Sequence, residues 1–169
     1  MDTSILLIYT GGTIGMKIDP QTQALAPFDF SHIMEEVPEL KKFGYKLDSY
    51  SFDPVIDSSD ADIPFWQELV RIIEINYNKY DGFVVLHGTD TMSYTASALS
   101  FMLENLGKPV IFTGSQLPIG MLRTDGKENL ISSIEIAAAK DDEERALVPE
   151  VCIYFESQLY RGNRTTKYN

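Results

Sequence analysis

The sequence has little of several features that mark particular classes of protein. Its one cysteine, Cys152, cannot form a disulfide within the chain and lies in an apolar run typical of a buried strand. Lysine and arginine number 14 against 25 acidic residues, and the net charge of −11 argues against binding to nucleic acid or to an anionic membrane surface. No apolar run is long enough to cross a membrane, and the N-terminus lacks a basic start, so we expect a cytoplasmic protein.

Residues that bind metals or nucleotides are also scarce. The two histidines, His32 and His87, are far apart in the sequence, and the acidic residues are scattered, so no zinc or iron pattern is present. We therefore expect no metal site. The glycine-rich stretch TGGTIG (10–15) resembles a phosphate-binding loop at first sight. Its glycines are spaced G-G-x-x-G rather than G-x-G-x-x-G, however, and the Gly-Lys-Ser/Thr of a P-loop is absent.

Apolar, β-rich runs alternate with helical patterns along the 169 residues, a length that fits one domain. Strands are predicted at 4–10, 82–87, 108–115 and 150–157, with extended segments at 45–59 that break at Pro54. Helices are predicted at 31–37, 65–80, 91–106 and 125–140, with Ser31 and Asp125 as caps, Pro64 in a first turn and Gly107 as a terminator. Because the strands are continuous apolar runs, we predict an α/β fold of three layers, with a largely parallel sheet and helices on both faces.

Hydroxyl groups, glycines and acids gather where the predicted strands end. The segments are TGGT (10–13), DSSD (57–60), HGTDT (87–91), TGSQ (113–116) and ESQLYRGNRTTK (156–167). The carboxyl ends of parallel strands meet at one edge of a sheet, and α/β proteins form their sites there. We therefore expect these segments to lie together and to form the functional site.

Each of these segments also has a purely structural interpretation. The glycines of 10–15 would make a tight exit from a strand, and Asp90 or Thr91 would cap the helix that follows. DSSD (57–60) would be a turn, and the basic segment 161–167 would be a solvated loop.

The functional interpretation assigns chemistry to the same residues. The hydroxyl of Thr13, placed in a turn that glycines open, is a candidate nucleophile, although a threonine needs a base or a charged neighbour to activate it. Asp90 would hold a positive charge, either a substrate amine or a lysine. Lys167, brought beside Thr89 and Asp90, would relay protons, because the pKa of lysine responds strongly to its surroundings.

Taken in order, four segments resemble one family. TGGTIG, DSSD, HGTDTMSYTASALSFMLENLGKPVIFTGSQLP (87–118) and LYRGNRTTK (159–167) are similar to a bacterial type I (cytoplasmic) L-asparaginase, and the resemblance extends through essentially the whole chain. It implies hydrolysis of L-asparagine to aspartate and ammonia through a threonine acyl-enzyme, without a cofactor. L-glutamine is a second, weaker candidate substrate, with the preference between the two left open, and the resemblance implies a homodimer or homotetramer for the full-length protein.

The resemblance further implies roles for individual residues. Thr13 is the nucleophile, and Thr89, Asp90 and Lys167 form a second catalytic group that moves protons. The residues implied in substrate binding are Asp57, Ser58, Ser59, Thr89 and Asp90. Among them, the serines surround the α-carboxylate and the amide, and Asp90 binds the α-amino group. Thr166 falls where type I members have an allosteric asparagine site.

Two features depart from the pattern of this family. Its members usually carry a tyrosine in the mobile loop after the nucleophile, but the loop at 16–30 has none, and the nearest tyrosine before it is Tyr9. The group that activates Thr13 is therefore left open. Members of the family are also longer and continue into a smaller carboxyl-terminal domain. We expect residues 1–169 to be the amino-terminal catalytic domain, with the smaller domain absent from this chain and with activity of the isolated chain left open.

Two other functions remain alternatives at this point. One is the asparaginase-like subunit of a tRNA-dependent amidotransferase, which would supply ammonia to a partner protein. Such subunits usually carry an additional amino-terminal domain, which we expect to be absent here. The other is a nucleotide-binding module that uses TGGTIG (10–15).

Overall fold

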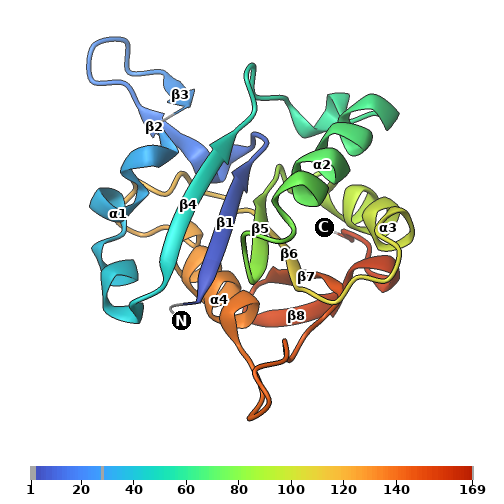
Figure 1. The fold of residues 1–169 in the computed structure, drawn as a ribbon. Coiled ribbons are helices and arrows are strands. Elements are labelled where there is room, and N and C mark those ends of the chain that lie inside the picture. Colours follow the sequence, from blue (N-terminus) through green and yellow to red (C-terminus); the bar gives the residue numbers. More distant parts are fainter. Residues whose placement is uncertain (1–2, 28, 169) are drawn as a thin grey trace.

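Six strands form one sheet in the order β4-β1-β5-β6-β7-β8 (Figure 1). The structure is a computed structural model and describes residues 3–27 and 29–168. The strands are β1 (Ser4–Tyr9), β4 (Lys46–Ser51), β5 (Gly82–Leu86), β6 (Val110–Thr113), β7 (Val151–Phe155) and β8 (Gln158–Arg161). The first five of these pair in parallel, and β8 pairs with β7 antiparallel. The predicted, largely parallel sheet is therefore confirmed.

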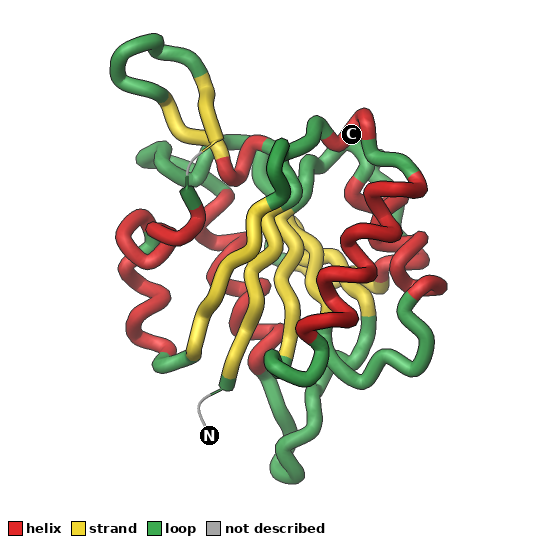
Figure 2. The backbone as a smooth tube through the Cα atoms, turned by 45° about the horizontal axis from the view of Figure 1, so that its top comes forward, coloured by secondary structure: helices red, strands yellow, loops and turns green. Residues whose placement is uncertain are grey.

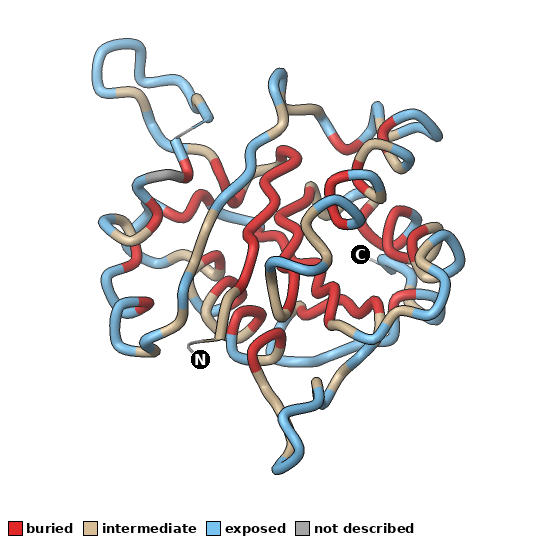
Figure 3. Tube along the Cα trace, viewed as in Figure 1, coloured by how far each residue is buried: buried red, intermediate tan, exposed pale blue. Residues whose placement is uncertain are grey.

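Helices cover both faces of the sheet (Figure 2). They are α1 (Ile33–Glu36), α2 (Ile63–Asn76), α3 (Met92–Met102) and α4 (Gly126–Ala138). Side chains alternate along a strand, so Leu7 and Tyr9 of β1 contact the layer of α1 and α4, whereas Leu6 and Ile8 contact that of α2 and α3. Burial on both faces explains the continuous apolar runs, and the buried residues follow the central strands (Figure 3).

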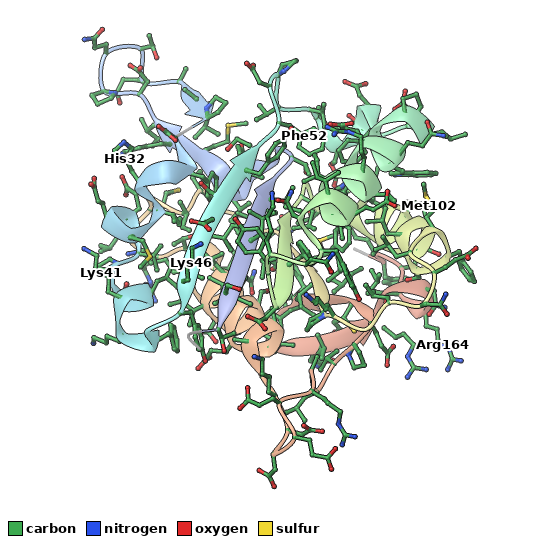
Figure 4. The ribbon with its side chains drawn as sticks, in the orientation of Figure 1. His32, Lys41, Lys46, Phe52, Met102 and Arg164 are labelled. Carbon is green, nitrogen blue, oxygen red and sulfur yellow. The ribbon has the colours of Figure 1, made fainter. Side chains whose placement is uncertain are left out.

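Side chains fill the space between the sheet and the helices, while charged ones such as Lys41 and Arg164 point outward (Figure 4). Cys152 lies inside β7 with 4% of its surface exposed, and burial, together with the charge of Glu150, raises the pKa of its thiol to about 11. The expectation of a buried strand cysteine is confirmed. Among the described residues, no helix is long and apolar enough to span a membrane.

All four helices differ by one to four residues from their predicted bounds, and the largest differences are in α2 and α3. The helix predicted at 65–80 begins at Ile63, because Asp62 accepts a hydrogen bond from the backbone N–H of Phe65 at 3.0 Å. Pro64 lies in its first turn, as predicted. The helix predicted at 91–106 ends at Met102, so Gly107 does not terminate it. The backbone N–H of Gly107 instead donates to the hydroxyl of Tyr77 at 2.8 Å.

The two predicted caps also have different outcomes. Asp125 occupies the N-cap position of α4, but its carboxylate makes no cap bond, so this prediction is wrong. Its oxygens accept from the backbone N–H groups of Gln116 and Leu117 at 2.9 and 3.1 Å instead. At the predicted helix 31–37, α1 starts at Ile33 with His32 in the N-cap position. The side chain of Ser31 lies outside the described part of the structure.

Two hairpins lack a strong signal in the sequence. Strand β8 is exposed along its length and so has no apolar run, and it follows β7 through a turn at Glu156 and Ser157, whose φ angles are 48° and 61°. Such left-handed turns suit a two-residue hairpin, but this pair lacks the usual Asn-Gly signature. The second hairpin, β2 (Met16–Ile18) with β3 (Leu25–Pro27), follows Thr13 and is mostly exposed.

The order of the strands places a topological switch point between β1 and β5. From β1 the chain moves outward to β4, returns across β1 to β5, and then continues to β6 and β7. The segments that follow β1 and β5 therefore leave the sheet in opposite directions. A crevice forms at such a point, outside the carboxyl ends of the strands, and these two segments contain Thr13 and Thr89.

Candidate active site

Thr13 follows β1 through a turn that two glycines make possible. Gly11 and Gly12 have φ angles of 144° and 88°, and Thr13 then begins a short 3-10 helix. A Cβ atom at Gly11 would lie 2.0 Å from the carbonyl oxygen of Ile56, and one at Gly12 would lie 2.6 Å from the backbone nitrogen of Gly88. The glycines therefore allow the turn to lie directly against the loops after β4 and β5.

The same close packing continues along the edge of the sheet. A Cβ atom at Gly88 would lie 2.4 Å from the hydroxyl oxygen of Ser58, and one at Gly114 would lie 2.5 Å from the carbonyl oxygen of His87. Loops after four neighbouring strands thus contact one another through positions that have no side chain. This packing explains why glycine recurs at the strand ends.

These loops enclose a pocket of about 330 Å³. It is lined by Gly12, Thr13, Met16, Val55, Ile56, Asp57, Ser58, Gly88, Thr89 and Asp90. The pocket brings together Thr13 with Asp57, Ser58, Thr89 and Asp90, which come from three segments of the sequence. Hydroxyl groups and carboxylates line the pocket together with the apolar side chains of Met16, Val55 and Ile56.

Lys167 contacts two of these residues from the far end of the chain. Its Nζ atom donates to Asp90 Oδ1 at 2.7 Å and to Thr89 Oγ1 at 3.1 Å. Figure 2 shows the end of the chain at the edge of the sheet where β1 and β5 end. The amide nitrogen of Gln116 approaches Thr89 Oγ1 from another side, at 3.5 Å. Thr89, Asp90 and Lys167 thus form one hydrogen-bonded group beside the pocket.

Asp57 and Ser59 contact each other in the turn after β4. Asp57 Oδ1 accepts from the hydroxyl of Ser59 at 2.7 Å and from its backbone N–H at 2.9 Å. The hydroxyl first, and then the backbone bond, lower the pKa of Asp57, which keeps this carboxylate ionised. Ser58 is buried and lines the pocket, whereas Ser59 is exposed and does not line it. The structure thus separates the two serines, and Ser59 anchors Asp57.

Thr166 lies outside this pocket, on the wall of a second one of about 560 Å³. The second pocket is lined by Thr89, Met92, Ser93, Gln116, Ile153, Phe155, Glu156, Tyr160, Thr165, Thr166, Lys167 and Tyr168. Thr89 lines both pockets, so they are neighbours that share one side chain.

Tyr9 does not replace the tyrosine missing from the loop at 16–30. Its ring is buried, packs against Phe30 with the ring centroids 4.6 Å apart, and occupies the space beside Gly15. Its hydroxyl donates to the carbonyl oxygen of Gly12 at 3.3 Å. Burial raises the pKa of Tyr9 to about 12, so the phenol keeps its proton and is a poor base near neutral pH. Tyr9 supports the turn that carries Thr13.

His87 is an internal support of the loop after β5. Its ring is buried beside Phe65 and Phe112, and its Nδ1 atom lies 2.8 Å from the carbonyl oxygen of Gly88. Burial lowers the pKa of His87 to about 4, so the ring is neutral at pH 7 and donates through Nδ1–H. Its Nε2 atom has no hydrogen-bond partner among the described residues. The ring is therefore isolated from the pocket and from solvent.

Sequence reasoning missed the residues that hold the loop after β6. Asp125 binds the backbone of residues 116–117, and Asn129 donates to the carbonyl oxygen of Gly114 at 2.9 Å. Together they fix the segment that carries Gln116 toward Thr89. The segment TGSQ (113–116), at the end of a predicted strand, indicated that this loop lies at the site. The role of Asp125 was not predicted, because an aspartate at the start of a helix more often caps that helix.

The chemistry of the site uses hydroxyls, carboxylates and one amine. Among the residues that the structure describes, no three histidine, cysteine or acidic side chains are grouped to hold a metal ion. The turn interpretation of 57–60 is correct for its backbone, because Ser58–Asp60 is a 3-10 turn with Asp57 as its cap. The same turn lines the pocket, so the structural and functional interpretations both hold there.

Known proteins resemble this chain over nearly all of its length. The protein-family model described as "Asparaginase, N-terminal" matches residues 4–169. L-asparaginase 1 of Escherichia coli (strain K12) is 46% identical over 172 residues, covering 97% of this chain and 47% of that protein. The crystal structure of L-asparaginase I from Vibrio cholerae O1 biovar eltor str. N16961 matches with a TM-score of 0.85 and 43% identity, covering 100% of this chain and 49% of the other.

A related protein bears on one of the alternatives. A glutamyl-tRNA(Gln) amidotransferase subunit of Pyrococcus abyssi is 39% identical over 138 residues, covering 80% of this chain and 31% of that protein. The chain thus spans about half the length, or less, of these relatives. Its motifs, its sheet and the match over residues 4–169 agree, and the chain belongs to the asparaginase family.

Proposed function

We propose that the full-length protein is an L-asparaginase, which hydrolyses L-asparagine to L-aspartate and ammonia. The observation that carries this proposal is the pocket in which Thr13 faces the loops of Asp57 and Asp90. Hydrolysis of an amide needs a nucleophile, a path for protons and hydrogen-bond donors for the developing oxyanion. Thr13 supplies the nucleophile, and Thr89 and Lys167 supply the path for protons. Backbone N–H groups of the glycine turns supply the donors for the oxyanion.

The reaction divides into two steps around an acyl-enzyme. In the first, Thr13 Oγ1 bonds to the amide carbon of the substrate, the C–N bond breaks, and ammonia leaves with the proton that the hydroxyl has lost. In the second, water adds to the ester carbon, the bond to Thr13 breaks, and the hydroxyl regains a proton. The hydrogen-bonded group of Thr89, Asp90 and Lys167 carries protons in these steps, because an ammonium held by a carboxylate and bonded to a hydroxyl is an effective relay.

The pocket matches a small zwitterion in size and charge. A volume of about 330 Å³ suits a molecule of the size of one amino acid. The carboxylates of Asp90 and Asp57 attract the α-amino group, and Ser58 offers a donor to the α-carboxylate. Ser59 contributes through Asp57 rather than by direct contact. L-glutamine, longer by one methylene, is a weaker substrate in this proposal.

The test is ammonia release from L-asparagine by the full-length protein. Thr13→Ala is expected to lower kcat by at least about 10³-fold, because it removes the nucleophile. Thr3→Ala, at the opposite end of the first strand segment, is the matched control and is expected to leave kcat unchanged. The assignment of Thr13 as nucleophile would be wrong if kcat fell equally in both variants, or if kcat of Thr13→Ala stayed near that of the wild type.

The second candidate is the ammonia-supplying component of an amidotransferase, which the similarity to the Pyrococcus abyssi protein supports. The same assay separates the two functions. An asparaginase turns over free L-asparagine at full rate without any partner, whereas an amidotransferase component is expected to need its partner protein and aminoacylated tRNA for comparable rates.

We also propose how the whole protein is organised. Residues 1–169 are its amino-terminal catalytic domain, and a smaller carboxyl-terminal domain follows. The name of the matching family region and the share of the relatives that the chain covers support this organisation. The protein acts in the cytoplasm as a homodimer or homotetramer, as in the type I enzymes that its motifs resemble. Light scattering of the full-length protein measures the oligomeric state.

The pocket that contains Thr166 is proposed as a regulatory site for L-asparagine. Its support is the shared side chain of Thr89, through which occupation of one pocket alters the surroundings of the other. Thr166→Val is expected to reduce any sigmoidal dependence of the rate on L-asparagine while leaving the maximal rate within about threefold.

A further inference from the structure

We propose that Thr91 is a positioning residue whose hydroxyl holds the substrate-binding turn of Ser58 against the loop that carries Thr89 and Asp90, an assignment that rests on the proposed function. Thr91 Oγ1 donates to the carbonyl oxygen of Ser58 at 2.6 Å, although the two residues are 33 positions apart. The bond joins the segment after β4 to the segment after β5. It therefore connects two walls of the same pocket.

The position of Thr91 in its helix makes this bond informative. Thr91 is the N-cap residue of α3, where a threonine hydroxyl ordinarily accepts a hydrogen bond from the first turn of the helix. Here the side chain makes no cap bond, and Tyr94 and Thr95 bond to its backbone carbonyl instead. The hydroxyl serves the turn of Ser58 rather than the helix that it begins.

Ser58 is held closely on its other sides. It is 6% exposed, and the backbone of Gly88 packs against its side chain so tightly that a Cβ atom there would lie 2.4 Å from the hydroxyl oxygen. Inside the turn, Ala61 donates to the carbonyl of Ser58 at 3.1 Å, and Ser59 bonds to Asp57. These internal bonds keep the shape of the turn, whereas the bond from Thr91 sets its distance from the loop after β5.

Loss of the bond therefore affects substrate binding more than chemistry. Without the hydroxyl, the carbonyl of Ser58 loses a partly buried hydrogen bond, and the turn moves relative to Asp90. The α-carboxylate and α-amino groups of the substrate contact these two walls, so their spacing controls affinity. The turn of Ser58 contains none of the residues proposed to react or to move protons, so Thr13, Thr89 and Lys167 keep their contacts.

The experiment compares three variants of the full-length protein in the asparaginase assay. Thr91→Val removes the hydroxyl at nearly constant volume and is expected to raise KM for L-asparagine at least about tenfold, with kcat within about threefold of the wild type. Thr91→Ser keeps the hydroxyl and is expected to restore KM. Ser100→Ala is the matched control, because the Ser100 hydroxyl lies on the same helix, α3, and donates to the helix carbonyl of Ala96 at 2.8 Å. It removes a hydroxyl bond outside the pocket and is expected to leave KM unchanged.

The outcomes separate this proposal from the proposed function. A wild-type KM in Thr91→Val, or a Thr91→Ser variant as impaired as Thr91→Val, would overturn the positioning role. Hydrogen exchange gives a readout that needs no activity: the amides of residues 59–61 are expected to exchange faster in Thr91→Val than in Thr91→Ser, and equal exchange would also overturn it. Absence of asparaginase activity in the wild type would instead count against the proposed function alone, since the exchange comparison still tests the bond.

Discussion

Lys167 Nζ lies 2.7 Å from Asp90 Oδ1, although 77 positions separate the two residues. The same ammonium donates to Thr89 Oγ1, so one cation connects the carboxylate to the hydroxyl. The lysine side chain is 32% exposed and that of Asp90 is 74% exposed, which makes this contact a weak source of stability. The contact places a proton donor beside Thr89, so we expect it to contribute to catalysis rather than to stability.

Replacement of Lys167 by methionine is expected to slow turnover much more than it weakens substrate binding. The change keeps the length of the side chain but removes the ammonium, so kcat should fall about 10²- to 10⁴-fold, as for loss of a general acid or base. KM should change only a few-fold. Steady-state kinetics of the full-length protein measure both constants. Lys127→Met, on α4, is the control for loss of one positive charge, and unchanged kcat in Lys167→Met would exclude the relay.

Tyr9→Phe tests whether this tyrosine only supports the turn. The variant keeps the buried ring and removes the hydroxyl bond to Gly12, so we expect a loss of about 1 kcal/mol in the free energy of unfolding. The pKa of Tyr9 is about 12, so the pH dependence of kcat between pH 7 and 9 should remain that of the wild type. A new loss of activity confined to alkaline pH in Tyr9→Phe would show that the phenol takes part in proton transfer.

His87 predicts a dependence of stability on pH. Its pKa is about 4 in the folded protein and about 6.5 when unfolded, so between these values the unfolded state binds more protons. Stability should therefore be complete above pH 6.5 and fall as the pH is lowered toward 4. The full contribution is about 3 kcal/mol, from about 1.4 kcal/mol for each unit of pKa difference.

The measurement is denaturant unfolding at pH 7, 6, 5 and 4.5. His87→Asn keeps a donor near the place of Nδ1 but does not titrate, so its stability should depend less on pH in this range. His32→Gln, which removes the exposed histidine, serves as the control and should follow the wild type. A His87→Asn variant with the full pH dependence of the wild type would contradict the assignment to His87.

Gly12 and Gly44 form a natural pair for testing why glycine is required at the pocket. Both have φ in the left-handed range, at 88° and 68°, but a Cβ atom at Gly12 meets the backbone of Gly88 at 2.6 Å, while one at Gly44 meets nothing within 4 Å. Gly44→Ala should cost about 1 kcal/mol from conformation alone. Gly12→Ala should cost several kcal/mol or abolish soluble expression. Equal melting temperatures for the two variants would mean that close packing is not the reason.

The prediction of the fold from sequence succeeded where burial was continuous. The runs at 4–10 and 82–87 became β1 and β5 within one or two residues, because strands buried on both faces are apolar throughout. Strand β8 was missed for the converse reason, since all four of its residues are exposed. The early end of α3 was missed because nothing in its composition changes at Met102.

The candidate site was predictable as a set of segments but not as a set of contacts. Parallel strands bring their carboxyl ends to one edge, so Thr13 and Thr89 were expected at the same edge, and only the strand order, with β1 beside β5, makes them neighbours. Ser59 illustrates the difference: it is adjacent in sequence to Ser58, yet its hydroxyl bonds to Asp57 and does not line the pocket. Neighbouring residues in a tight turn point in different directions.

The sequence by itself determined the alternation of strands and helices, the edge at which the hydroxyls and acids collect, and the family. These depend on local patterns of apolar residues and on motifs. The tertiary structure alone decided which partner each polar side chain bonds. Asp125 binds the loop before it instead of capping α4, Thr91 binds Ser58 instead of capping α3, and Tyr9 binds Gly12. A carboxylate or hydroxyl accepts or donates wherever folding brings a partner within about 3 Å, and a partner distant in the sequence is set only by the packing of the whole chain.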